Sequence, residues 1–238
     1  MSINIKGKIA IVTGASRGIG EGIAKVFSTE GATVICAARS TVDGDRVVKS
    51  INEKGGSAIF IQADIRLEAD CKRLINTVVE KYGRLDIMCH NAGIYPDELM
   101  EDMSIETWDN TINTNLRSCF LLTKPCVKVM RAQKSGRILF TSSITGPNVA
   151  QARLAAYSSS KGALNILTEV LAEEYAESGP KFNSLSLGSV NTPMLKEAFP
   201  GYSAKVNPDE MASFIFNFAN TASSIFNGKV IPVSSTNP

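Results

Sequence analysis

Tyr157 and Lys161 lie four residues apart, and Ser143 precedes both of them in the chain. On a helix, residues four apart share a face, so the phenol of Tyr157 and the ammonium of Lys161 can converge on one point. A phenol has a pKa of about 10 in a model peptide, and a neighbouring ammonium lowers that pKa enough to make Tyr157 a general acid or base. Ser143 can hold a carbonyl or alcohol oxygen while the proton moves. The pair alone is also compatible with a surface lysine that covers a half-buried tyrosine.

A glycine-rich turn stands near the start of the chain. The short apolar run over residues 8–13 predicts a buried strand, and Gly14-Ala15-Ser16-Arg17-Gly18-Ile19-Gly20 separates it from apolar residues at helical spacing. Gly14 permits a tight turn, Gly18 lets the backbone approach a pyrophosphate, and Gly20 lets the helix pack close to the strand. The helix N-terminus supplies free N–H groups for phosphates. The turn therefore predicts a dinucleotide site.

Together these motifs resemble the short-chain dehydrogenase/reductase family, from residue 8 to about residue 233. The resemblance implies a Rossmann-type fold and a nicotinamide cofactor. It implies cofactor contacts from the glycine turn, from the motif after the fourth strand and from a loop that touches the nicotinamide carboxamide: Gly14, Ser16, Arg17, Gly18, Ile19, Gly20, Asn91, Ala92, Gly93, Gly188, Val190 and Thr192.

The resemblance also assigns catalytic roles. In reduction, Ser143 and Tyr157 donate hydrogen bonds to a carbonyl oxygen, and Tyr157 delivers the proton. Lys161 lowers the pKa of Tyr157 and binds the nicotinamide ribose, and Asn115 holds a water that relays protons. Ser143 is chosen over Ser142 because the residues that follow it match the family pattern in register. The other interpretations are a turn serine at position 143 and a helix-interior asparagine at position 115.

The residues after the second predicted strand bear on the choice of cofactor. A carboxylate there would bind the ribose 2′-OH of NAD, but the chain has Arg39 and Ser40 and no carboxylate before Asp43. The planar fork of Arg39 can pair with a 2′-phosphate, Ser40 can add a hydroxyl contact, and Arg17 offers a second positive charge. NADP(H) is therefore favoured over NAD(H). The alternative is that both arginines are solvated loop residues.

Asp64 and Ile65 follow the third predicted strand, where the family contacts the adenine. Asp64 would accept a hydrogen bond from the exocyclic amine, and Ile65 would pack nearby. Asp64 could equally cap the next helix, because Asp is favoured at helix N-caps.

Apolar runs alternate with helical patterns along the whole chain. This alternation predicts an α/β protein with a Rossmann-type, doubly wound parallel sheet of about seven strands flanked by helices, in a single domain over residues 1–238. Ligands of such sheets bind beyond the carboxyl ends of the strands, where the motif residues fall. The expected strands are residues 8–13, 32–38, 57–63, 85–90, 136–142, 181–187 and 229–233, and the expected helices are 19–30, 43–54, 68–82, 104–131, 155–178 and 208–221.

Composition excludes several function classes. The net charge is +2, from 25 Lys and Arg against 23 Asp and Glu, which gives no reason to expect nucleic acid or a membrane as partner. A single histidine, His90, leaves almost no ligands for a catalytic metal, and we expect it to fill a strand end. Five cysteines without a pairing pattern indicate a reduced, cytoplasmic protein.

The chain departs from the family pattern in three places. Leu187 stands where the family has proline, which predicts a looser loop at Gly188. A short segment over residues 195–207 replaces a longer helical lid, and Val233-Ser234-Ser235 replaces Val-Asp-Gly-Gly at a frequent subunit contact. These departures leave open an alternative function, a low-turnover NADP(H)-binding sensor or interaction protein.

The family implies a homo-oligomer, a dimer or tetramer, that acts on a small carbonyl or alcohol substrate, including 3-oxoacyl thioesters. Long helices could supply a subunit contact or face the sheet through Ile112, Phe120, Leu164 and Leu171. The residues expected around the substrate are Tyr95, Val149, Arg153, Leu154 and Met194. Arg153 could attract an anionic substrate or be an exposed loop arginine.

Overall fold

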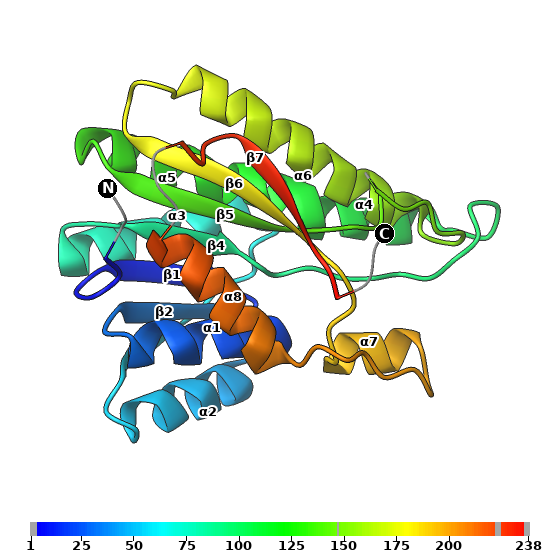
Figure 1. Cartoon of the computed structure of the whole chain (residues 1–238), viewed down its shortest axis with the longest axis horizontal. Helices are drawn as coiled ribbons and strands as arrows, with labels where there is room; N and C mark the ends of the chain where they lie inside the picture. The colour runs from blue at the N-terminus through cyan, green and yellow to red at the C-terminus, as the bar shows by residue number, and fades with distance from the viewer. Residues whose placement is uncertain (1–3, 147, 222–224, 236–238) are drawn as a thin grey trace.

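The computed structural model describes residues 4–146, 148–221 and 225–235. Its centre is a parallel sheet of seven strands in the order β3-β2-β1-β4-β5-β6-β7 (Figure 1). The strands are β1 (Ile9–Thr13), β2 (Thr33–Ala38), β3 (Ser57–Gln62), β4 (Ile87–His90), β5 (Gly136–Ser143), β6 (Pro180–Leu187) and β7 (Lys229–Val233). The predicted Rossmann-type doubly wound sheet is confirmed.

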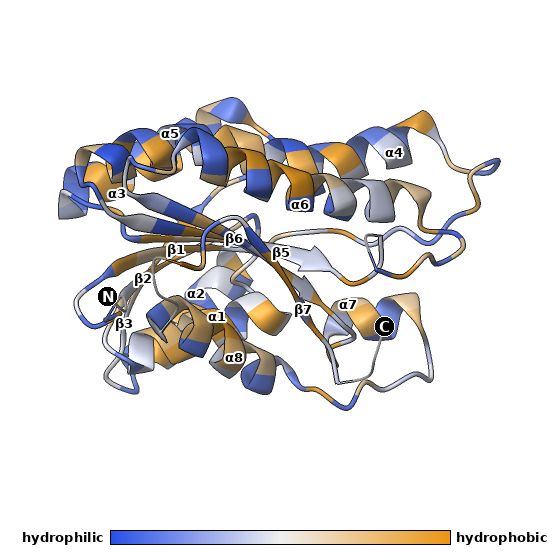
Figure 2. Cartoon of the chain, turned by 45° about the horizontal axis from the view of Figure 1, so that its top comes forward, coloured by the Kyte–Doolittle hydropathy of each residue, from blue (hydrophilic) through white to orange (hydrophobic). Residues whose placement is uncertain are grey.

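Helices cover both faces of the sheet, as Figure 2 shows. One layer holds α1 (Gly18–Thr29), α2 (Thr41–Asn52) and α8 (Pro208–Thr221), and the other holds α3 (Glu68–Tyr82), α4 (Ile105–Ile112), α5 (Ser118–Ala132) and α6 (Ala155–Glu174). Each layer has its own apolar core, which includes Phe27 of α1 on one face and Leu74 of α3 on the other. Burial on both faces explains why the strands are almost continuously apolar.

The strand order reverses at β1, which pairs with β2 on one side and with β4 on the other. In a parallel sheet this reversal opens a crevice beyond the carboxyl ends of the two strands, because their following segments leave toward opposite faces. The glycine turn follows β1 at this point, and Asn91 follows β4. The topology alone therefore places the two motifs side by side.

The predicted helix over residues 104–131 is not continuous. A π-helical segment, η1 (Asn113–Arg117), separates α4 from α5, and it contains the buried Asn115. Periodicity does not reveal a π turn, because the single extra residue shifts the apolar pattern only slightly. The segment expected to be a short lid contains a further helix, α7 (Pro193–Ala198), which lies apart from both helical layers at the right of Figure 1.

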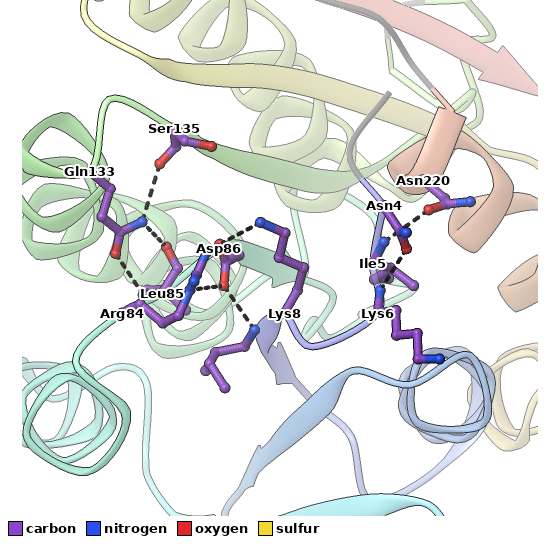
Figure 3. A network of polar contacts seen from close by, with 11 residues as sticks. Asn4, Ile5, Lys6, Lys8, Arg84, Leu85, Asp86, Gln133, Ser135 and Asn220 are labelled. Carbon is purple, nitrogen blue, oxygen red and sulfur yellow. Dashed lines mark hydrogen bonds and ion pairs between the residues drawn. The ribbon is translucent and has the colours of Figure 1, made fainter. Parts of the chain in front are cut away.

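A polar network fastens β1 to β4 at the amino ends of the strands (Figure 3). The carboxylate of Asp86 accepts hydrogen bonds from the Ile9 N–H at 2.9 Å and from the Arg84 guanidinium at 2.6 and 2.8 Å, and Lys8 lies 3.5 Å away. Burial would raise the pKa of Asp86, but the bonds from Arg84 and Ile9 outweigh it and hold that pKa below its usual value. This end of the sheet is structural, opposite the expected site.

The histidine and the cysteines, from which no chemistry was expected, are buried. His90 stacks on Phe140 with ring centroids 4.9 Å apart and bonds Thr123 at 3.0 Å, and burial lowers its pKa to about 3. It is therefore neutral, and it fills the end of β4 as predicted. The five cysteines are buried free thiols. No helix in the part of the chain that the structure describes has the length and apolar composition to cross a bilayer.

Candidate active site

A cavity of about 830 Å³ lies at the carboxyl ends of the strands. It gathers residues from segments that are distant in the sequence, namely the turn after β1, the ends of β2 to β6, α6 and α7. Nearly all the predicted site residues line it: Gly14, Ser16, Arg17, Gly18, Ile19, Arg39, Ser40, Asp64, Ile65, Asn91, Ala92, Gly93, Ser143, Tyr157, Lys161, Gly188, Val190 and Thr192. Gly20 and Asn115 stand behind its wall.

The glycine turn is closed by contacts that leave no room for side chains. Gly14 has a left-handed φ of +66°, and a Cβ on it would lie 2.9 Å from the Cα of Ala92. A Cβ on Gly20 would lie 2.3 Å from the Gly14 carbonyl oxygen and 2.5 Å from the Asn91 Nδ2. Asn91 donates from that amide to the carbonyl of Thr13 at 3.1 Å. The turn is thus a cradle of bare backbone at the N-terminus of α1.

Arg46 on α2 holds this cradle from outside, and sequence reasoning missed it. Its guanidinium donates to the Ser16 carbonyl at 3.0 Å and to both carboxylate oxygens of Glu21 at 2.8 and 3.1 Å. Lys25 binds the same carboxylate at 2.6 Å. The spacing of 25 residues between Glu21 and Arg46 leaves no local signal, because the contact exists only once α1 and α2 pack together.

The residues predicted to meet a 2′-phosphate all line the cavity. Arg39 is exposed there, and the Ser40 hydroxyl donates to the Asp43 carboxylate at 2.8 Å while capping α2. A donation from Ser40 to a phosphate requires that bond to break. Arg17 extends from the glycine turn and pairs with Glu197 of α7 at 3.3 Å, with both side chains largely exposed.

Asp64 lines the cavity but is not the cap of the next helix, because the N-cap of α3 is Leu67. Its carboxylate forms a two-pronged pair with Arg66, with Nη2–Oδ2 at 2.6 Å and Nε–Oδ1 at 2.9 Å. Arg66 also donates to Asn110 on α4 at 2.9 Å. The bonds from Arg66 hold the pKa of Asp64 below its usual value despite burial. Asp64 is therefore a fixed anion with an acceptor edge on the cavity.

Ser143, Tyr157 and Lys161, which were predicted to be catalytic, lie together at the cavity. Lys161 is buried, and its Nζ lies 5.7 Å from the ring centroid of Tyr157 and donates to the Thr141 carbonyl at 2.7 Å. Ser143 ends β5 and accepts from the Thr145 N–H at 3.1 Å. Ser142 points the other way and donates to the Lys161 carbonyl at 2.9 Å. The structure thus distinguishes the two serines: the Ser143 side chain interacts with Tyr157 and lowers the pKa of its phenol, and Ser142 anchors α6.

The pKa of Tyr157 differs from the expectation. Burial raises it, and the hydrogen bond with Ser143 lowers it by less, so that Tyr157 holds its proton at neutral pH. The expected lowering by Lys161 is not seen, because that ammonium lies beneath the ring and bonds the Thr141 carbonyl. Burial also lowers the pKa of Lys161 to about 8. The protein alone therefore presents a protonated phenol, the form that can donate to a carbonyl oxygen.

Asn115 supports the site from behind. Its carboxamide accepts from the Ile94 N–H at 2.9 Å and donates to the Ile94 carbonyl at 3.0 Å and to the Ser160 hydroxyl at 3.1 Å. A Cβ on Gly93 would lie 3.3 Å from the Asn115 Oδ1 and 3.6 Å from the Lys161 Nζ. The π turn directs this side chain between the β4 loop and α6. The water-relay role stays a prediction, and the observed contacts are those of a positioning residue.

The loop after β6 closes the cavity. The Gly188 N–H donates to the Val233 carbonyl at 2.8 Å, and a Cβ on Gly188 would lie 2.7 Å from the Ser234 hydroxyl. The Leu187 carbonyl accepts from the Ile144 N–H at 3.0 Å, so the residue that replaces proline is held in the sheet. Thr192 caps α7 and lies near Gly18. A Cβ built on Gly18 would lie 3.4 Å from the methyl group of Thr192.

Tyr95, Val149 and Met194 line the cavity as expected, but Arg153 and Leu154 do not. Arg153 is an exposed loop residue that donates to the carboxylate and the carbonyl of Asp97, and Leu154 is buried at the start of α6. Sequence reasoning missed further lining residues because no motif marks them: Ile94, Thr141, Thr145, Gln151, Leu195 and Phe199. Within the described ranges no cluster of three or more His, Cys, Asp or Glu could hold a metal ion.

The fold and this cavity define a dinucleotide-binding α/β protein. The family model described as short chain dehydrogenase matches residues 8–203, and the chain belongs to that family. This confirms the resemblance inferred from the motifs, and membership implies a nicotinamide cofactor and oxidoreductase activity.

Several named proteins are similar along most of their length. Oxidoreductase UcpA of Salmonella typhimurium (strain LT2) is 38% identical over 218 residues, 90% of this chain and 80% of that protein. The 3-oxoacyl-[acyl-carrier-protein] reductase FabG of Thermotoga maritima is 32% identical over 244 residues, 97% of this chain and 98% of that protein. The crystal structure of a short-chain type dehydrogenase/reductase from Mycobacterium marinum superposes with a TM-score of 0.90 at 28% identity, over 97% of this chain and 95% of that one.

Proposed function

We propose that this protein is an NADP(H)-dependent oxidoreductase that reduces a ketone to a secondary alcohol, or runs the reverse reaction. The observation that carries the proposal is the convergence of Ser143, Tyr157 and Lys161 on the same cavity as the glycine cradle. A protein that only binds a nucleotide has no need for a buried lysine beneath a protonated phenol. The similarity to 3-oxoacyl-[acyl-carrier-protein] reductases supports the same reaction type.

The cavity fits a nicotinamide dinucleotide. The cradle at Gly14 and Gly20 excludes any Cβ, so that backbone N–H groups can approach a pyrophosphate. Asp64 and Ile65 would hold the adenine, Arg39 the 2′-phosphate, and Lys161 the nicotinamide ribose. We expect Asn91, Ala92, Gly93, Gly188, Val190 and Thr192 to line the nicotinamide end. When bound, the cofactor supplies the hydride.

The chain's own residues supply the proton and the orientation of the substrate. Ser143 and Tyr157 hold the carbonyl oxygen by hydrogen bonds that strengthen as negative charge develops on it. Tyr157 then donates its phenolic proton to that oxygen. The Lys161 ammonium stabilises the phenolate that remains, because an adjacent positive charge favours the ionised form. Asn115 fixes the β4 loop and Ser160 around this group.

Tyr157→Phe tests the proposal directly. Removing the proton donor should lower kcat by about 10²–10⁴-fold, the usual contribution of a positioned general acid. The nucleotide dissociation constant should stay near that of the wild type, because the ring and Lys161 remain. Tyr175→Phe, which makes the same change at the C-cap of the same helix, is the matched control and should keep full turnover. Near-normal turnover of Tyr157→Phe would refute the role of Tyr157.

The preference for NADP(H) is supported by Arg39, which follows β2 and lines the cavity, and by Arg17 in the glycine turn. No acidic side chain precedes Asp43 after β2, so that a ribose 2′-OH has no carboxylate at the strand end. We expect NADPH to bind more tightly than NADH in a calorimetric titration of the wild type. Equal affinities, or tighter binding of NADH, would contradict this preference.

The rest of the proposal concerns assembly and location. We propose one domain over residues 1–238 that forms a homo-oligomer through α5 and α6, in the cytoplasm. Phe120, Ile166 and Val170 are 55%, 61% and 47% exposed on these helices, and a second copy of the chain packed on α5 and α6 would bury them. Leu164 and Leu171 pack against the sheet instead. Sedimentation of the wild type and of Phe120→Glu tests the contact, and the variant should dissociate to monomers.

A further inference from the structure

The part of the cavity next to Tyr157 has aromatic walls. Tyr95 follows β4, and its ring centroid lies 4.6 Å from that of Tyr157 at an interplanar angle of 56°. Phe199 follows α7 and meets Tyr95 edge-on at 5.8 Å. Val149 and Met194 line the same cavity. Such surfaces bind flat apolar groups in offset or edge-to-face contact.

The polar groups that the described residues place along this wall are neutral. The side chain of Gln151 interacts with Tyr95, and burial raises the pKa of Tyr95 above the usual value for a phenol. Tyr95 therefore keeps its proton across the physiological range, and the Gln151 amide carries no charge.

The charges of the cavity lie elsewhere. Among its described lining residues the ionisable acids and bases are Arg17, Arg39, Asp43, Asp64, Arg66 and Lys161. Arg17 lies within the glycine turn, where Glu197 of α7 pairs with it, four follow β2 and β3, and Lys161 bonds the Thr141 carbonyl behind Tyr157. The segments that surround the Tyr157 ring, with Tyr95, Val149, Gln151, Met194 and Phe199, add none.

Arg153, the arginine of the loop that carries Gln151, already has an acidic partner. Arg153 lies two residues beyond Gln151, but its guanidinium is held by the Asp97 carboxylate and carbonyl, and neither residue lines the cavity. A carboxylate or phosphate brought against Tyr95 would lose its water without gaining a cation. Burying an ionised group without a partner is strongly unfavourable.

We propose that the substrate is an uncharged carbonyl compound with a flat apolar body, such as an aryl ketone, and that Tyr95 and Phe199 select it. This inference rests on the proposed reductase function and specifies its substrate class. The aromatic body lies against the Tyr95 and Phe199 rings, and the carbonyl oxygen reaches Ser143 and Tyr157. Binding energy comes from buried apolar area, and selectivity comes from the absence of a cation.

Two matched pairs of substrates test the inference with NADPH and the wild-type protein. Methyl 4-acetylbenzoate and 4-acetylbenzoate differ in charge, and acetophenone and butanone differ in the aromatic ring. We expect kcat/KM to be about 10- to 100-fold higher for the ester than for the acid, and higher for acetophenone than for butanone. Equal values, or a preference for the acid or for butanone, overturn the inference but leave the reductase function standing. Absence of turnover with these compounds and with a broad set of ketones and diketones overturns both.

Substitutions in the wall provide an independent arm. Phe199→Ala should raise the KM for acetophenone by about 3- to 10-fold, the contribution of one aromatic contact, and raise the KM for butanone by less. Phe199→Leu keeps apolar volume and serves if the smaller variant fails to bind NADPH. Equal changes for the two ketones overturn the selective role of Phe199.

The charge argument has its own matched variants. Gln151 is exposed at the cavity wall, so both lysine and methionine can replace it without burial of a charge. Both substitutions remove the amide group that interacts with Tyr95, and only lysine adds a cation. Gln151→Lys should therefore raise kcat/KM for 4-acetylbenzoate at least about 10-fold over Gln151→Met, with little change for its methyl ester. No gain overturns the claim that a missing cation excludes anionic substrates.

Discussion

Gly20→Ala, which adds a single methyl group, should weaken nucleotide binding in a chain that still folds. The Cβ of Gly20→Ala would lie 2.3 Å from the Gly14 carbonyl oxygen and 2.5 Å from the Asn91 Nδ2. Non-bonded heavy atoms prefer separations of about 3.5 Å, so α1 must move roughly 1 Å away from the turn. Both obstacles are held in place, since the first is backbone and Asn91 bonds the Thr13 carbonyl.

The expected magnitudes follow from this geometry. Overpacking of this kind costs about 1–3 kcal/mol of unfolding free energy. Hydrogen bonds to a charged group contribute about 1.5–3 kcal/mol each, and loss of one such bond to a phosphate raises a dissociation constant by about 10- to 100-fold. We therefore expect Gly20→Ala to weaken NADPH binding by at least that factor, and to weaken NADH binding equally, because both nucleotides carry the same pyrophosphate.

Gly162→Ala is the matched control. Gly162 lies in α6, and a Cβ on it would meet no atom within 4 Å. Alanine should raise the unfolding free energy there by about 1 kcal/mol through helix propensity and leave the affinity unchanged. Both variants replace a helical glycine by alanine, so the difference between their unfolding free energies no longer contains the gain from helix propensity. Urea unfolding and calorimetric titration give both quantities. If Gly20→Ala bound NADPH like the wild type, the cradle at Gly14 would not be the phosphate site.

Three further predictions concern charge. Arg39→Ala should raise the dissociation constant of NADPH about 10- to 100-fold and that of NADH little, since one charge-assisted contact to a phosphate is lost; equal losses in the two titrations would place the 2′-phosphate elsewhere. Asp86→Asn should lower the unfolding free energy by about 1.5–3 kcal/mol at pH 7. Because the pKa of Asp86 is lowered in the folded protein, the deficit of the variant relative to the wild type should shrink as the pH falls below about 4. A deficit independent of pH in urea titrations would contradict the ion-pair account. The pKa of Lys161 is about 8 in the folded protein, against 10.5 for an exposed lysine. The unfolded chain therefore binds more protons between pH 8 and 10.5, and the unfolding free energy of the wild type relative to Lys161→Met should rise with pH over that range. If this free-energy difference did not change with pH, the ammonium would be well solvated.

How far the sequence predicts the site depends on whether a contact is local. The Tyr157–Lys161 pair lies on one helix, and the glycine turn lies between one strand and one helix. In both cases the periods of regular structure decide the geometry. Ser143 was predicted by register, and the structure distinguishes it from Ser142 through the bond from Ser142 to the Lys161 carbonyl.

Contacts between segments distant in the chain were not predictable. The bond from Arg46 to the Ser16 carbonyl and the bond from Arg66 to Asn110 depend on how separate elements pack together. The pKa of Tyr157 moved opposite to the expectation for the same reason. Burial depends on the whole fold, and it outweighed the neighbouring charge that the spacing had suggested.

The sequence by itself determined the class of fold, the family and the positions of the glycine turn and the Tyr157–Lys161 pair, because each depends on residues within one or two elements. The tertiary structure alone decided which further residues complete the cavity walls around the predicted Tyr95, Val149 and Met194. Tyr95, Gln151 and Phe199 come from three separate loops with no shared motif, and they meet only because the parallel sheet brings the carboxyl ends of its strands to one edge.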